Sequence, residues 1–120
     1  MNTIFDDDRY RYSITREEAK SDVGKGWASL LDKIYDNLRP ETQVLQVKEK
    51  FGGLRFYVGG ATTEEFDVID QAEEDSYTIC EQCGKEGKLR EDLGWILTLC
   101  DEHYEEIKKN RRWVVKDEQT

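Results

Sequence analysis

The clearest hydrophobic pattern in the chain is a helical stripe in its first third. From residue 27, apolar side chains recur at intervals of three and four, which places them on one face of an α-helix; they are Trp27, Leu30, Leu31, Ile34 and Leu38. The helix is predicted to end before Pro40, since proline cannot continue it. Upstream, Thr15 followed by Glu18 is typical of a capping box that starts a shorter helix, which Gly24 and Gly26 then interrupt.

The pattern changes to the alternation of β-strands over residues 43–58. The Gly-Gly pair at residues 52–53 is typical of a two-residue hairpin turn. With Phe51 placed opposite Leu54, one face of the hairpin is predicted to be apolar and to face the core: Leu45, Val47, Phe51, Leu54, Phe56 and Val58. The opposite face then carries Lys48, Lys50, Arg55 and Tyr57.

The same pairing places Glu49 opposite Phe56 on the apolar face. A buried carboxylate needs a hydrogen-bonding or cationic partner, or else its pKa rises. We therefore expect Glu49 to make a structural tie to a backbone or arginine group, with acid–base catalysis beside Tyr57 as the lesser alternative.

A second amphipathic helix is predicted after the hairpin. Thr62 or Thr63 can cap its start, and it should end near Ser76. Its apolar stripe consists of Phe66, Ile69 and Ala72.

The C-terminal third holds all three cysteines and the single histidine, arranged in two pairs. Cys80 and Cys83 are separated by two residues and followed by Gly84, which permits the positive φ of a metal-binding knuckle. Cys100 and His103 are three apart, a spacing that lies on one side of a helical turn. We predict that these four residues bind one structural zinc ion, with no open position for an activated water.

The residues around these pairs predict a small lobe. Residues 88–99 can form a short hairpin with Trp95, Leu97 and Leu99 on one face, and residues 101–110 a helix. Knuckle, hairpin and ligand-bearing helix in this order are similar to the treble-clef class of zinc finger. Residues 113–115 are expected to add a final strand. The aromatic side chains expected to pack within apolar surroundings are Trp27, Trp95 and Trp113.

The predicted fold class is therefore α+β. Residues 1–78 form an α/β part (arm, helix, hairpin, helix), and residues 79–120 form a treble-clef-like zinc lobe packed on the hairpin as one compact unit. No apolar run reaches the length of a membrane span, and residues 1–8 lack a secretory leader, so we expect a cytoplasmic protein in a bacterial cell.

Charge narrows the choice of partner. The formal net charge of −9 disfavours nucleic acid without excluding a local basic patch, and suits a basic surface on a partner protein. Lys48, Lys50, Arg55 and Tyr57 could grip a carboxylate-rich loop, a phosphate or a nucleotide; the alternative is a solvated face that neutralises the acids of residues 63–75. Residues 6–8, all aspartate, could bind a hard cation or simply be solvated.

Catalysis is not expected, because the predicted metal site uses every cysteine and the only histidine. Cysteine–histidine nucleophilic chemistry and a histidine general base are both excluded on this ground.

Several segments of the chain resemble a family of small proteins found in bacterial, prophage and phage genomes. The shared segments are Gly26-Trp27, residues 46–57, Cys80-x-x-Cys83-Gly84, Gly94-Trp95 and Cys100-x-x-His103. The resemblance supports the fold and implies no particular activity.

Our leading hypothesis is a non-enzymatic, zinc-stabilised protein-interaction module, such as a phage- or prophage-encoded inhibitor of a host system. A close variant is an immunity protein that masks a toxin. The alternative is a nucleic-acid or nucleotide binder that uses the face of Lys48, Lys50, Arg55 and Tyr57 beside the basic residues Lys108, Lys109, Arg111 and Arg112.

Overall fold

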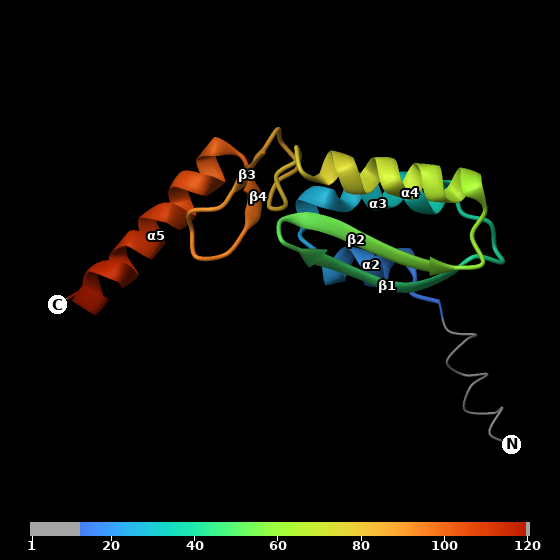
Figure 1. Ribbon diagram of the computed structural model, residues 1–120, viewed down its shortest axis with the longest axis horizontal. Coiled ribbons are helices and arrows are strands. Elements are labelled where there is room, and N and C mark those ends of the chain that lie inside the picture. The colour runs from blue at the N-terminus through green and yellow to red at the C-terminus, as the bar shows by residue number, and fades with distance from the viewer. Residues whose placement is uncertain (1–12, 120) are drawn as a thin grey trace, which may run out of the picture.

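The fold is α+β, as predicted (Figure 1). The computed structural model describes the backbone of residues 13–119 and the side chains of residues 13–110; the predicted arm and its three aspartates lie outside the described residues. In chain order the elements are α2 (Arg16–Asp22), the 3-10 turn η1 (Lys25–Trp27), α3 (Ala28–Asp36), β1 (Gln43–Lys50), β2 (Gly53–Gly59), α4 (Thr63–Ser76), β3 (Lys88–Arg90), β4 (Leu97–Leu99) and α5 (Asp101–Gln119).

The helices α2 and α4 contact the β1–β2 hairpin, α3 packs against both of these helices, and all three share one core with the hairpin. The elements β3, β4 and α5 lie beyond the tip of that hairpin (Figure 1). The stripe predicted from residue 27 is confirmed at Trp27, Leu30, Leu31 and Ile34, which are all buried, whereas Leu38 lies beyond the end of α3 and is partly buried. Among the described residues, no helix combines the length and apolar character needed to span a membrane.

Both predicted N-caps form capping boxes. Thr15 caps α2 with Glu18, and Thr62 caps α4 with Glu65. The predicted stripe of α4 is only partly correct, because Ile69 and Ala72 are buried but Phe66 is 46% exposed. Two polar residues, Glu65 and Ser76, take inward positions instead.

The hairpin is confirmed, but its predicted register is wrong. Glu49 pairs with Leu54, and the turn is formed by Phe51 and Gly52, whose φ angles of 55° and 83° suit a turn with two left-handed residues. Gly53 serves packing instead of the turn, since a Cβ there would lie 2.4 Å from the Tyr77 ring.

The new register and a bulge between Val44 and Gln46 remove two residues from the predicted core. Leu45 and Phe51 are 50% and 60% exposed, whereas Val44 is buried in place of Leu45. The partner of each β1 residue moves by two positions along β2, and a shift of two keeps the other side chains on their predicted faces. Val47, Leu54 and Phe56 are buried as predicted.

The outer edge of β2 is covered by polar side chains of α4. The backbone N–H of Leu54 donates to the Ser76 hydroxyl (2.9 Å), and that of Phe56 donates to the Glu73 carboxylate (2.8 Å). These contacts satisfy edge donors that would otherwise be open to another strand.

Two further predictions are wrong. The segment 113–115 continues α5 and does not form a strand, because extending an existing helix adds one hydrogen bond per residue and no glycine or proline stops it. Trp95 is 51% exposed and is not a packed core residue. The side chain of Trp113 lies outside the described residues.

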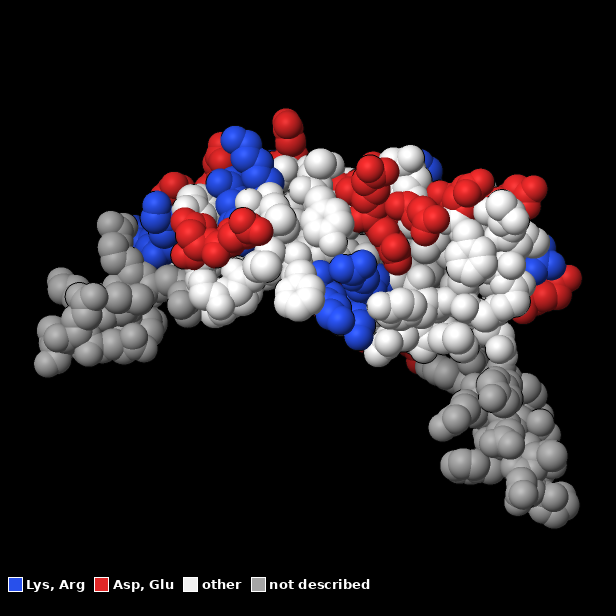
Figure 2. All heavy atoms as spheres, viewed as in Figure 1, with Lys and Arg blue, Asp and Glu red and all other residues white. Residues whose placement is uncertain are grey.

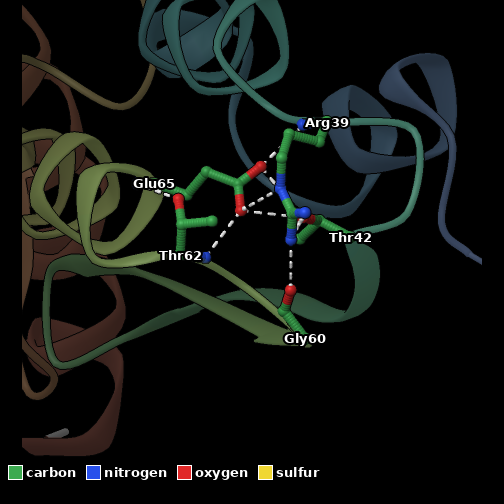
Figure 3. Close-up of polar contacts among 5 residues, drawn as sticks. All are labelled: Arg39, Thr42, Gly60, Thr62 and Glu65. Atoms are coloured by element: carbon green, nitrogen blue, oxygen red, sulfur yellow. Dashed lines mark hydrogen bonds and ion pairs between the residues drawn. The ribbon is translucent and has the colours of Figure 1, made fainter.

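A buried carboxylate joins the loops at the end of the hairpin opposite its tip (Figure 3). Glu65 is 3% exposed and accepts hydrogen bonds from the backbone N–H groups of Arg39 (2.6 Å) and Thr62 (2.8 Å) and from the Thr42 hydroxyl (2.8 Å). Burial alone would raise the pKa of Glu65, but these donors and the Arg39 charge outweigh it and lower the pKa to about 2. Arg39 also donates to the carbonyl oxygen of Gly60 (2.6 Å).

Glu65→Gln should therefore destabilise the protein at neutral pH, because one of the surrounding N–H or O–H donors loses its acceptor. We expect Tm to fall by on the order of 5 °C at pH 7. The ionised form of Glu65 stabilises the fold above its unfolded pKa of 4.5, and this contribution is lost as pH falls towards 2. The difference in Tm between wild type and variant should shrink over that interval.

The matched control is Glu64→Gln on the exposed side of the same helical turn, which should change Tm much less. A Glu65→Gln variant with wild-type Tm at pH 7 would contradict this role.

Candidate metal centre

Cys80, Cys83, Cys100 and His103 converge at one point in the C-terminal lobe. Their ligand atoms all lie within 4.8 Å of one another, and this group could hold a metal ion. Cys83 Sγ lies 3.8 Å from Cys100 Sγ, and His103 Nδ1 lies 3.6 Å from Cys80 Sγ and 3.3 Å from Cys100 Sγ. The four residues singled out from the sequence are therefore brought together.

The first pair lies in a tight knuckle between α4 and β3. The N–H of Gly84 donates to the Cys80 carbonyl oxygen (2.9 Å), and Gly84 has the positive φ, 84°, that its sequence position suggested. Burial alone would raise the pKa of the Cys80 thiol, but backbone N–H groups of Cys100, Gln82 and Cys83 outweigh it and lower the pKa. At Cys80 the knuckle thus favours the thiolate, the form that binds a metal. At Cys83 the backbone N–H of Lys85 lowers the pKa, but burial and the neighbouring Cys80 and Cys100 thiols outweigh it and raise that pKa.

The second pair lies where β4 meets α5, and a side chain from β3 holds that junction. Arg90 donates to the carbonyl oxygen of Leu99 (3.1 Å) and pairs with Asp101 (2.7 Å). Its guanidinium lies 4.2 Å from the centre of the Tyr104 ring, whose hydroxyl donates to Asp92. These contacts fix the first turn of α5, which carries His103 one position before Tyr104.

The knuckle packs directly on the turn before α3. The N–H of Gly26 donates to the Glu81 carbonyl oxygen (2.8 Å), and the Trp27 indole donates to the Ile79 carbonyl oxygen (2.8 Å). A Cβ on Gly26 would lie 1.9 Å from the Cys80 carbonyl oxygen. Gly24 and Gly26, recognised in the sequence only as helix breakers, therefore allow the two backbones to touch.

Glu81 and Thr98 join the knuckle to the hairpin tip, and sequence reasoning missed both. The N–H of Glu81 donates to the Thr98 carbonyl oxygen (3.0 Å), and the Thr98 N–H donates to the Glu81 carboxylate (2.9 Å). The Thr98 hydroxyl then donates to the carbonyl oxygen of Gly52 (2.6 Å). The sequence offered one signal for Glu81: it lies between Cys80 and Cys83, where a carboxylate is not needed as a metal ligand.

The role expected for Glu49 is a backbone tie, and this is what the structure has. Its carboxylate accepts the N–H of Gly52 (2.7 Å), so both backbone polar groups of Gly52 are engaged. The hairpin tip is held from one side by its own strand and from the other by the lobe.

The second predicted site, the outer hairpin face, is separate from the cysteine–histidine cluster. The pairing of Lys48 with Arg55 and of Gln46 with Tyr57 places Lys48, Lys50, Arg55 and Tyr57 on one face, as predicted. Within the described part of the chain, no ion pair joins any of these three cations to an acid of α4.

The four clustered side chains offer three sulfur ligands and one imidazole ligand to a metal ion. A four-coordinate ion bound by all of them would have no position left for a water molecule. Comparisons of the chain with protein-family models, with curated proteins and with solved structures found no match.

Proposed function

We propose that Cys80, Cys83, Cys100 and His103 hold one structural zinc ion. In a tetrahedral zinc site with usual bond lengths, sulfur atoms lie about 3.8 Å apart, and sulfur and nitrogen about 3.6 Å apart. The Cys83–Cys100 and Cys80–His103 distances of 3.8 and 3.6 Å match these edges, and the Cys100–His103 distance of 3.3 Å is shorter than its edge. Three thiolates and an imidazole are also the ligands that favour zinc over hard cations.

With the metal site closed, we place the function on a surface, and we propose a non-enzymatic protein-interaction module. The observation that carries this proposal is the outer hairpin face, which presents Leu45, Phe51 and Tyr57 at 44–60% exposure. Beside them lie three cations that form no ion pair with any residue whose side chain is described. Large exposed apolar side chains on a fixed scaffold are typical of protein-binding surfaces.

A module of this kind acts by occupying a surface of its partner. This is the mode of action of an inhibitor of a host protein or of an immunity protein that masks a toxin, the two roles favoured by the sequence. The net charge of −9 opposes the alternative, nucleic-acid binding, because the chain as a whole repels phosphate.

The metal proposal predicts one zinc ion per chain by elemental analysis of purified protein. His103→Asn should lose the zinc and the cooperative unfolding of the lobe, because three ligands no longer close the site. His103→Cys should retain zinc, since a four-cysteine site is an equally common structural arrangement. Zinc below half an equivalent in wild type, or full retention by His103→Asn, would refute the assignment.

The interaction proposal predicts that the immobilised, zinc-loaded chain retains a protein from bacterial lysate saturably. The control is an unrelated folded protein of equal net charge, which removes partners bound by charge alone. We expect at least tenfold enrichment over this control in quantitative mass spectrometry. Recovery of nucleic acid as the enriched component, or of no protein from lysates of several hosts, would count against the proposal.

A further inference from the structure

We propose that the outer hairpin face binds an extended acidic protein segment that carries a large apolar side chain next to its carboxylates. This face consists of Lys48, Lys50, Arg55 and Tyr57, with Phe51 at its tip end. This inference rests on the proposed interaction function and adds to it the chemistry of the partner.

Among the described residues, the cations of this face lack the ion-pair partners that five other cations have. Arg16, Lys20, Arg39, Lys85 and Arg90 all form ion pairs with acids. Within the range where side chains are described, Lys48, Lys50 and Arg55 form none, and the Nε of Arg55 is buried without an acceptor. Carboxylates of a partner would supply the missing ion pairs, because arginine binds a carboxylate through two parallel N–H groups and lysine binds one as a point charge.

The spacing of the lysines sets the conformation of the bound segment. Lys48 and Lys50 lie two residues apart on one strand face, so their Cα atoms are separated by roughly 7 Å. Carboxylates at alternate positions of an extended segment have the same spacing. An extended segment with acids at every second residue therefore matches the two lysines, and a neighbouring acid reaches Arg55 on the paired strand.

Aromatic rings provide the apolar part of the surface. Lys50 Nζ lies 5.6 Å from the centre of the Phe51 ring, and Lys48 Nζ lies 5.8 Å from that of Tyr57. Phe51 is 60% exposed and has a φ of 55°, a conformation that is costly for a bulky side chain. A bulky residue that is held in a strained backbone conformation while its side chain stays exposed is typical of a functional site.

The lobe fixes this surface in place before any partner arrives. Leu89, itself 40% exposed, contacts the tip, because a Cβ on Gly52 would lie 2.6 Å from its Cδ1. The hydrogen bonds of Gly52 to Glu49 and Thr98 hold the backbone that presents Phe51. A preorganised surface loses little conformational entropy on binding.

Protein is favoured over nucleic acid because the patch is small and bordered by acids. Figure 2 shows Lys and Arg side chains gathered at the centre of one face, directly beside the acidic side chains over α4. The charge of Arg55 acts on Glu73, which places this helix beside the patch. A polyphosphate longer than a few nucleotides would meet these acids, whereas a short acidic segment fits between them.

The test uses a fluorescein-labelled nine-residue peptide with glutamate at its first, third and fifth positions, phenylalanine at its seventh and serine elsewhere. We expect saturable binding to the zinc-loaded full chain by fluorescence anisotropy, at least tenfold weaker for Lys48→Glu/Arg55→Glu. Lys25→Glu/Lys33→Glu is the matched control on two exposed lysines outside this face and should change affinity less than twofold.

Phe51→Asn tests the apolar contribution without endangering the fold, because asparagine tolerates the left-handed turn conformation better than phenylalanine. The Phe51→Asn variant should bind the peptide at least threefold more weakly than wild type does. A second peptide, with serine in place of phenylalanine, should bind the variant and wild type equally. Equal Tm values of all variants and wild type establish that folding is intact.

The inference would be overturned if the peptide does not bind saturably, or if a peptide with glutamine in place of glutamate binds equally well. Tighter binding of a nine-nucleotide oligo-dT than of the peptide would also overturn it, as would self-association of the chain that Lys48→Glu/Arg55→Glu abolishes. A lysate partner retained equally by Lys48→Glu/Arg55→Glu would also overturn it while the interaction function stands.

Discussion

A continuous series of hydrogen bonds through the cysteine knuckle joins the two halves of this protein. It runs from the N–H of Gly26 to Glu81, from Glu81 to Thr98, and from the Thr98 hydroxyl to Gly52 at the hairpin tip. Glu81 and Thr98 are both buried, so a break in the series would leave polar groups without partners away from water. The position of the hairpin tip therefore depends on the fold of the knuckle.

This dependence gives the proposed zinc ion a role beyond stabilising its own lobe. The ion would hold the knuckle to the first turn of α5, the knuckle holds Thr98, and Thr98 holds the backbone that presents Phe51. At the opposite end of the hairpin, Glu65 joins the loops independently of the lobe (Figure 3). A surface fixed at both ends can bind a partner without first becoming ordered.

Local signals in the sequence predicted most of the elements and all four clustered ligands. Spacing alone identified the two cysteine and histidine pairs that cluster, because ligand type and separation are characteristic of metal binding. The hairpin register was not predictable in this way, because either Phe51-Gly52 or Gly52-Gly53 could form the turn. In the observed register Tyr77, directly after α4, packs against Gly53, a contact between residues distant in the sequence. The burial of Glu65 and Glu81 likewise depends on donors distant in the sequence.

We infer that the metal centre positions the hairpin tip through the knuckle. Residue-resolved amide hydrogen exchange of the zinc-loaded and chelated protein tests this inference most directly. Chelation should accelerate exchange at Gly26, Glu81 and Thr98, whose N–H groups form the series through the knuckle, while Arg39 and Thr62, whose N–H groups bind Glu65, keep their protection. Unchanged protection of Gly26 and Thr98 after removal of the metal would contradict it.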